Sequence, residues 1–199
     1  MKPQDKNAKI RVPKFYKRLL LVAIVVGPMW WLVFTEDGQR RSDMVLLKLF
    51  GDEPLYLNLK VLDDHFTEQE IRQLYPDIPW QCEQKVSAFG VRTCYGKIGS
   101  FNQIPADHAK LFFGDSTLNA VKVVYSRNYH GILGKDLNHQ LGKPLPSFAS
   151  DDIPSDDTVV RWRADGGVVM AKKKLNKGDE PALLWLSSTQ MARGSRPGR

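Results

Sequence analysis

Residues 17–38 read KRLLLVAIVVGPMWWLVFTEDG, and this stretch decides how the rest of the chain is interpreted. The sixteen residues from 19 to 34 carry no charge. As a helix they would measure about 24 Å, slightly less than the roughly 30 Å hydrocarbon core of a bilayer. Lys17 and Arg18 can extend to the headgroups at one end, and Trp30 and Trp31 suit the interface at the other. We therefore predict a transmembrane helix over residues 19–35.

A retained anchor is favoured over a cleaved leader. The apolar run is longer than the roughly 7 to 15 residues of a signal peptide, and it ends in VFTE, which lacks the small residues of a cleavage site. A long charged segment also precedes it. A cleaved leader and a buried helix of a soluble protein are the two alternatives.

The basic residues predict the orientation of the anchor. Seven lysines and arginines precede the span, and three follow it within about fifteen residues. This asymmetry places residues 1–18, a basic segment, in the cytoplasm. We expect a single-pass protein of a bacterial inner membrane, bound to the bilayer through this helix, with the chain after residue 35 in the periplasm.

The formal charge of +7 belongs to the two ends of the chain. Without residues 1–18 and 191–199, the chain has 19 basic and 21 acidic residues, a net charge of −2. A nearly neutral domain does not offer the basic surface that binds phosphates, so nucleic acid is not an expected partner. Residues 189–199 are expected to form a disordered basic tail.

The two cysteines predict a cross-linked hairpin. Residues 80–96 read WQCEQKVSAFGVRTCYG, and Ala88 lies midway between Cys82 and Cys94 in a turn-like stretch. A hairpin folded there places Cys82 opposite Cys94, and in the oxidising periplasm such a pair forms a structural disulfide. The spacing matches neither C-x-x-C redox motifs nor zinc motifs, so no metal is expected there.

Residues 54–188 are long enough for one domain, and their pattern predicts an α+β fold. LYLNLKV alternates leucines and predicts a strand over 55–61. Thr67 and Glu70 form a capping box for a short helix, with Phe66 and Ile71 at the hydrophobic staple positions. The juxtamembrane segment, residues 36–53, either prolongs the first helix or lies on the membrane surface with Met44 and Leu47 directed downward.

Further strands and one more helix are expected along this domain. Strands are predicted at 108–113 and 118–126 around the turn GDST, and a three-stranded meander at 158–188 with turns at Asp165-Gly166 and 176–180. A second helix is predicted in residues 128–144, with Asn128 as its cap. Its apolar stripe comprises Tyr129, Leu133, Leu137 and Leu141.

The two helices, FTEQEIRQLYP and DLNHQLGKP, are each stopped by proline and followed by strands. This order resembles the helix-plus-sheet modules of the small outer-membrane lipoprotein A family (BamE-like) and of the β-lactamase inhibitor proteins. The resemblance implies an antiparallel sheet with two short helices, built from a duplicated unit that serves as a binding scaffold. It implies no particular functional residue, and the chain lacks the lipobox cysteine of the lipoproteins.

No catalytic motif stands out. The sequence contains no G-x-S-x-G, H-E-x-x-H or P-loop pattern, and His130 and His139 fall on opposite faces of the predicted helix. The acidic residues Asp151, Asp152, Asp156 and Asp157 lack the order of a calcium loop and are interpreted as a solvated loop. We therefore expect neither enzyme activity nor a cofactor.

The expected function is that of a non-catalytic protein-binding, assembly or inhibitory module whose partner is another envelope protein. One alternative is an envelope hydrolase acting on cell-wall or lipid substrate, with His65, His108 or His130 as its base. Another is a secreted binding protein with a cleaved leader. Trp162 and Trp185 are either core residues or aromatic anchors on a free face of the sheet, and their burial decides between these interpretations.

Overall fold

The computed structural model describes residues 13–115, 117–146 and 158–194. The chain forms two compact parts, Met1–Asp43 and Met44–Arg199.

The first part contains helix α1, Lys14–Phe34, which is long and apolar enough to cross a membrane. It begins five residues before the predicted span, and none of its side chains is buried within the chain. The helix ends because Thr35 is extended, and the Thr35 N–H and hydroxyl both donate to the Trp31 carbonyl, at 3.2 and 2.6 Å.

Helix α2, Glu36–Phe50, starts immediately afterwards. The Thr35 hydroxyl accepts a hydrogen bond from the Gly38 N–H at 3.0 Å, so the same side chain ends one helix and caps the next. Of the two alternatives for this segment, the structure excludes a simple prolongation of α1.

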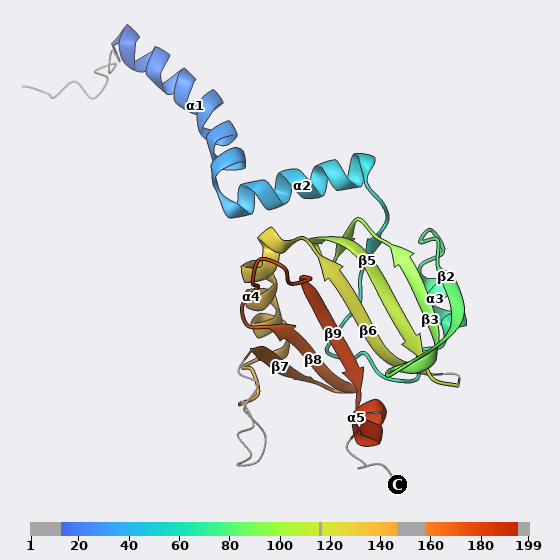
Figure 1. The fold of residues 1–199 in the computed structure, drawn as a ribbon. Coiled ribbons are helices and arrows are strands. Elements are labelled where there is room, and N and C mark those ends of the chain that lie inside the picture. Colours follow the sequence, from blue (N-terminus) through green and yellow to red (C-terminus); the bar gives the residue numbers. More distant parts are fainter. Residues whose placement is uncertain (1–12, 116, 147–157, 195–199) are drawn as a thin grey trace, which may run out of the picture. The chain divides into compact units, whose positions relative to one another are not determined.

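The second part is built on one mostly antiparallel sheet (Figure 1). Seven strands follow the order β2-β3-β5-β6-β9-β8-β7, and two short strands, β1 and β4, extend from the start of β5. The strands are β1 Pro54–Leu55, β2 Gln81–Ser87, β3 Gly90–Lys97, β4 Ser100–Phe101, β5 Ile104–Phe113, β6 Leu118–Tyr125, β7 Val159–Ala164, β8 Gly167–Lys172 and β9 Ala182–Ser187. The predicted hairpin, its neighbouring strands and the final meander are therefore confirmed, and the fold is α+β.

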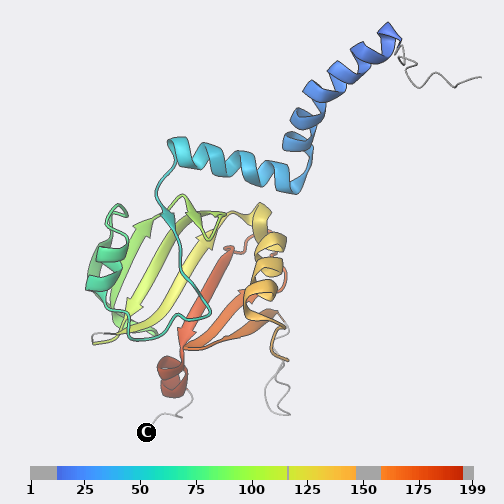
Figure 2. The same cartoon turned by 180° about the vertical axis from the view of Figure 1, so that it is seen from behind.

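One face of this sheet is covered by α3, Glu68–Leu74, by α4, His130–Leu141, and by the segment 55–66 (Figure 2). One row of covered side chains runs across these seven strands in register, and most of its members lie in the hydrophobic core. The row comprises Cys82, Cys94, Leu111, Val121, Trp185, Val169 and Trp162.

The predicted strand over residues 55–61 is wrong beyond its first residue. Only Pro54–Leu55 pairs as a strand. Leu57 and Leu59 are buried, as the alternation predicts, but Val61 is 55% exposed. The physical reason lies in Asn102, whose side chain accepts from the Leu57 N–H and donates to the Leu57 carbonyl, at 3.0 and 2.8 Å. The Asn102 side-chain amide thus binds backbone groups that would otherwise pair with a neighbouring strand. The segment crosses the sheet face as an unpaired strap.

The first predicted helix is confirmed with its cap. The Thr67 hydroxyl accepts from the Glu70 N–H at 3.3 Å, and the Glu70 carboxylate accepts from the Thr67 N–H at 2.8 Å. Ile71 is buried, and Phe66 packs against the core. Both staple positions therefore contribute to packing, as predicted.

The second predicted helix has the expected apolar stripe but a different start. Tyr129, Leu133 and Leu137 are buried, and Leu141 packs against them. Asn128 is not the cap, because it lies inside a 3-10 turn, η1, Arg127–Tyr129, that precedes α4. This turn places the Tyr129 ring in the core directly after β6.

The end of the chain differs from the expected disordered tail over residues 189–194. Helix α5, Ser188–Gly194, follows β9 directly. The Ser187 hydroxyl accepts from the Gln190 N–H at 3.1 Å, and the Gln190 side chain donates to the Ala88 carbonyl at 2.8 Å. These contacts stabilise a helix that the composition of the tail does not reveal. Residues 195–199 lie outside the described residues.

Candidate functional site

The second face of the sheet, turned toward the viewer in Figure 1, is not covered by α3, α4 or the segment 55–66. We call it the open face and define it by two rows of side chains that run across seven strands in register. The first row comprises Gln81, Tyr95, Lys110, Lys122, Leu184, Met170 and Arg161. The second comprises Glu83, Thr93, Phe112, Ala120, Leu186, Val168 and Arg163.

The centre of the open face is apolar. Leu184, Leu186, Val168 and Met170, on β8 and β9, are each partly accessible to solvent. Strands that alternate between core and solvent normally carry polar residues at such outward positions. An apolar group on the uncovered side of a sheet is typical of a surface that binds another molecule.

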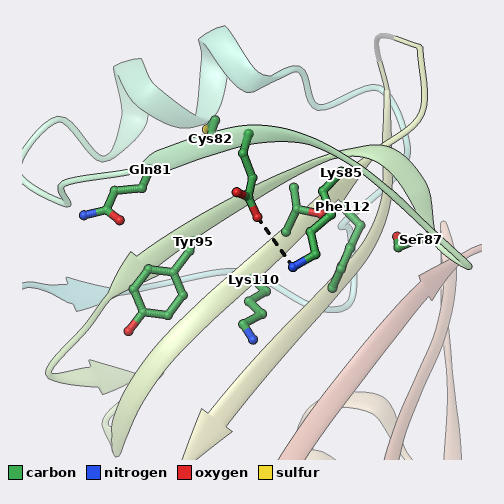
Figure 3. A pocket seen from close by; sticks show the side chains of 9 residues that line it. Gln81, Cys82, Lys85, Ser87, Tyr95, Lys110 and Phe112 are labelled. Atoms are coloured by element: carbon green, nitrogen blue, oxygen red, sulfur yellow. Dashed lines mark ion pairs between the residues drawn. The ribbon is translucent and has the colours of Figure 1, made fainter.

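A groove of about 580 Å³ lies on β2, β3 and β5 of the same face, and β6 separates it from this apolar centre. Figure 3 shows Gln81 and Lys85 on β2 and Tyr95, Lys110 and Phe112 on the neighbouring strands around it. The Phe112 ring contacts the Phe89 ring of the β2–β3 turn at a centroid distance of 5.3 Å. The lining residues are Gln81, Cys82, Glu83, Lys85, Ser87, Thr93, Tyr95, Lys110 and Phe112.

The carboxylates near the open face are already bound by cations. Glu83 pairs with Lys85 at 3.7 Å, and Asp179 pairs with Lys172 at 2.7 Å. Glu180 accepts a hydrogen bond from Lys122, which lowers the pKa of that carboxyl. Hydrogen bonds from Lys172 and from the Asn176 backbone likewise lower the pKa of Asp179.

Three cations of the open face have no such partner. Lys110, Arg161 and Arg163 form no ion pair with any described residue. Lys110 and Arg161 are also partly buried. Within the part of the chain that the structure describes, the open face therefore carries three cations without an ion-paired carboxylate, although the domain as a whole is nearly neutral.

Thr93 contributes an unused polar atom to the groove. Its residue is 8% exposed, and its hydroxyl oxygen has no hydrogen-bond partner among the described residues. A buried hydroxyl without a partner costs about 1–3 kcal/mol. Such a group is commonly satisfied by a ligand or by ordered water.

The predicted site residues are found in two different places. Lys17, Arg18, Trp30 and Trp31 are all exposed on α1, which is compatible with the predicted membrane anchor. Within the second part, the sulfur atoms of Cys82 and Cys94 lie at disulfide-bonding distance, with Cα atoms 4.0 Å apart in directly paired positions.

Trp162 and Trp185 are 3% and 0% exposed and lie on the covered face. The Trp162 indole N–H donates to the Asn138 side chain of α4 at 2.9 Å. The core interpretation of both tryptophans is confirmed, and the interpretation as partner anchors is wrong, because neither ring reaches the open face.

Two of the four histidines contact a neighbouring polar side chain, and the other two are exposed. His108 Nδ1 lies 2.6 Å from the Asp107 carboxylate, an arrangement that orients an imidazole, but its Nε2 is buried and has no partner among the described residues. His130 Nδ1 and the Tyr125 hydroxyl share a hydrogen bond at 2.7 Å. Burial raises the pKa of Tyr125 to about 12, so this hydroxyl stays protonated. His65 and His139 are exposed.

One group of metal-ligand type occurs among the described residues, formed by Glu68, Cys82 and Cys94. The Glu68 carboxylate is bound by Arg72 and Arg92, and the two sulfur atoms are bonded to each other. The group therefore acts as a structural link between α3 and the hairpin. The acidic residues 151, 152, 156 and 157 of the predicted solvated loop lie outside the described residues.

Sequence reasoning missed the open-face residues, including Lys110, Thr93 and Leu184. One signal was present in ALLWLS, residues 182–187, where every residue except the last is apolar. A strand in a sheet with one solvated face would alternate, so a continuous apolar run predicts that both faces make contacts. Comparison with protein-family models, curated proteins and solved structures found no match for this chain.

Proposed function

We propose that this chain is a single-pass envelope protein whose outer domain binds another envelope protein on the open face of its sheet. It acts as an assembly or inhibitory module without chemistry of its own. The observation that carries this proposal is the apolar centre of the open face, Leu184, Leu186, Val168 and Met170, which the covering helices leave accessible. The fully buried core of a protein interface is more apolar than the rest of the protein surface, as this group is.

The proposed topology places the N-terminus in the cytoplasm and the domain in the periplasm. It rests on the length and composition of α1 and on the excess of basic residues before it. A periplasmic reporter fused after Gly194 should be active, and a cytoplasmic reporter at the same position should be silent. The opposite pattern would reverse the topology, and mass spectrometry of the mature N-terminus tests the alternative of a cleaved leader.

The order of elements supports the resemblance to duplicated binding scaffolds. Helix α3 is followed by the antiparallel strands β2, β3 and β5, and α4 is followed by β7, β8 and β9. The two groups share one sheet through β6, which pairs with both β5 and β9. We propose that the two groups are copies of one unit whose joint sheet presents the binding face.

Site-directed cross-linking in cells tests the binding face. A photoreactive residue at position 184 or 170 should cross-link to a discrete partner, whereas the same residue at the exposed Tyr56, outside the open face, should not. The variant Leu184→Asp should then lose the partner. Leu74→Asp is the matched control, because Leu74 is 58% exposed on α3, outside the open face. Equal partner recovery with Leu184→Asp and with the unmodified protein would contradict the proposal.

The alternative function is that of an envelope hydrolase with His108 as base. The observation that favours it is the contact between His108 Nδ1 and the Asp107 carboxylate. Purified protein would then release fragments from cell-wall or lipid substrates, and His108→Gln would abolish the release. The absence of turnover with both substrate classes, in protein that still captures its partner, would exclude this alternative.

A further inference from the structure

The groove of the open face contains a cation, Lys110, that forms no ion pair with any described residue. Lys110 is partly buried at the middle of β5, between Tyr95 on β3 and Lys122 on β6. Its side-chain ammonium group makes no hydrogen bond or ion pair with a described residue. Glu180, with which it interacts electrostatically, is hydrogen-bonded to Lys122 instead. A partly desolvated charge without a partner attracts an external anion.

A second, independent feature of the same groove also calls for a ligand. The Thr93 hydroxyl, on the neighbouring strand β3, is buried and without a partner among the described residues. Thr93 and Lys110 both line the groove. Thr93 on β3 pairs in register with Phe112 on β5, and Lys110 on β5 pairs in register with Tyr95 on β3. A carboxylate between them could accept hydrogen bonds from both groups.

The aromatic residues of the groove favour a ligand that carries apolar side chains next to its negative charge. Phe112 and Tyr95 each provide an aromatic ring in the groove beside Lys110. An extended peptide directs successive side chains to opposite sides, so a peptide that alternates acidic and apolar residues presents one kind of side chain to each surface it contacts. Arg161 and Arg163 at the far edge add positive charge that would attract further acidic residues.

We propose that the groove between β2 and β5 binds an acidic segment of the partner protein, with one carboxylate held by Lys110 and the Thr93 hydroxyl. The proposal rests on the proposed function and names the chemistry of the partner. Binding should weaken as salt is raised, because the carboxylate and Lys110 attract each other electrostatically at a partly solvated site.

The test uses the full chain in neutral detergent micelles and fluorescence anisotropy. The probe is a fluorescein-labelled peptide of about eight alternating glutamate and valine residues, long enough to cross several strands. Its control is the same peptide with glutamine in place of glutamate. The acidic peptide should bind about tenfold more tightly than the glutamine peptide, the ratio expected when a charge-assisted hydrogen bond is lost.

Three variants locate the site. Lys110→Gln should weaken binding of the acidic peptide about tenfold, and Thr93→Val about fivefold. Lys60→Gln removes the same charge from an exposed lysine outside the open face and should change nothing. Thermal melting of each variant shows that the domain is still folded.

Three outcomes would overturn the inference. These are equal binding of the two peptides, unchanged affinity in Lys110→Gln, and displacement of the peptide by glycerol 3-phosphate at peptide-like concentration, which would indicate a lipid headgroup site. The proposed function has its own readout, because Leu184→Asp tests partner capture at the apolar centre. Partner loss in Leu184→Asp with no effect of Lys110→Gln would therefore reject the acidic segment and retain the binding face.

Discussion

Removal of the cross-link between Cys82 and Cys94 should lower the stability of the second part of the chain by about 3 kcal/mol. The two cysteines are 12 positions apart. In the chain-entropy model, closing a loop of this length restricts the unfolded chain by about 3 kcal/mol. For a domain of this size, each kcal/mol corresponds to about 2–4 °C in melting temperature, so the double variant Cys82→Ala/Cys94→Ala should melt about 6–12 °C lower.

The measurement is thermal melting of the full chain in detergent, followed by near-ultraviolet circular dichroism. Trp162 and Trp185 are buried in the core, so the signal reports loss of packing in this domain. Reduced unmodified protein is the matched control, because it keeps both sulfur atoms and loses only the bond. If the double variant melts at a lower temperature than the reduced protein, the difference reports the lost packing of the Cys94 side chain, which is 2% exposed.

Two results would refute this reasoning. If the oxidised protein and the double variant melt within about 2 °C of each other, the bond does not stabilise the domain by restricting the unfolded chain. If thiol labelling finds both cysteines free in protein taken from cells, the bond does not form there, and the proposed oxidising compartment loses support.

Three other changes are expected to alter stability. Thr67→Ala removes the side-chain half of the capping box on α3 and should cost about 1 kcal/mol by urea unfolding, whereas Thr67→Ser should cost little. Hydrogen bonds from Arg92 and Arg72 lower the pKa of Glu68 in the folded protein. The stability that ionised Glu68 contributes is therefore present above its pKa in the unfolded chain, and it is lost as the pH falls through its pKa in the folded protein. Glu68→Gln should therefore flatten the decline in melting temperature below about pH 5, and an unchanged slope would contradict this. Trp185→Ala should cost about 3–5 kcal/mol, and a much smaller loss would mean that the site collapses around the missing ring.

The local elements of this protein follow from patterns among neighbouring residues. An uncharged run of sufficient length predicts α1, and the pair Thr67 and Glu70 predicts α3, because each signal depends on neighbouring residues alone. The hairpin was predictable for the same reason, since its two cysteines are close in sequence and its turn lies midway between them. The spacing of leucines likewise predicted which side of α4 is buried.

Only the tertiary structure decided which surfaces these elements leave exposed. The alternation of LYLNLKV predicts a strand, but the Asn102 side chain, 45 positions from Leu57, binds its backbone and makes the segment a strap across the sheet. Trp185 and Leu184 are adjacent and both apolar, yet one ring is enclosed under the covering segments and the other side chain lies on the open face. Lys110 and Thr93 share a groove because β3 and β5 pair in one register. Register and coverage depend on contacts between residues far apart in the chain, and a local pattern does not encode these contacts.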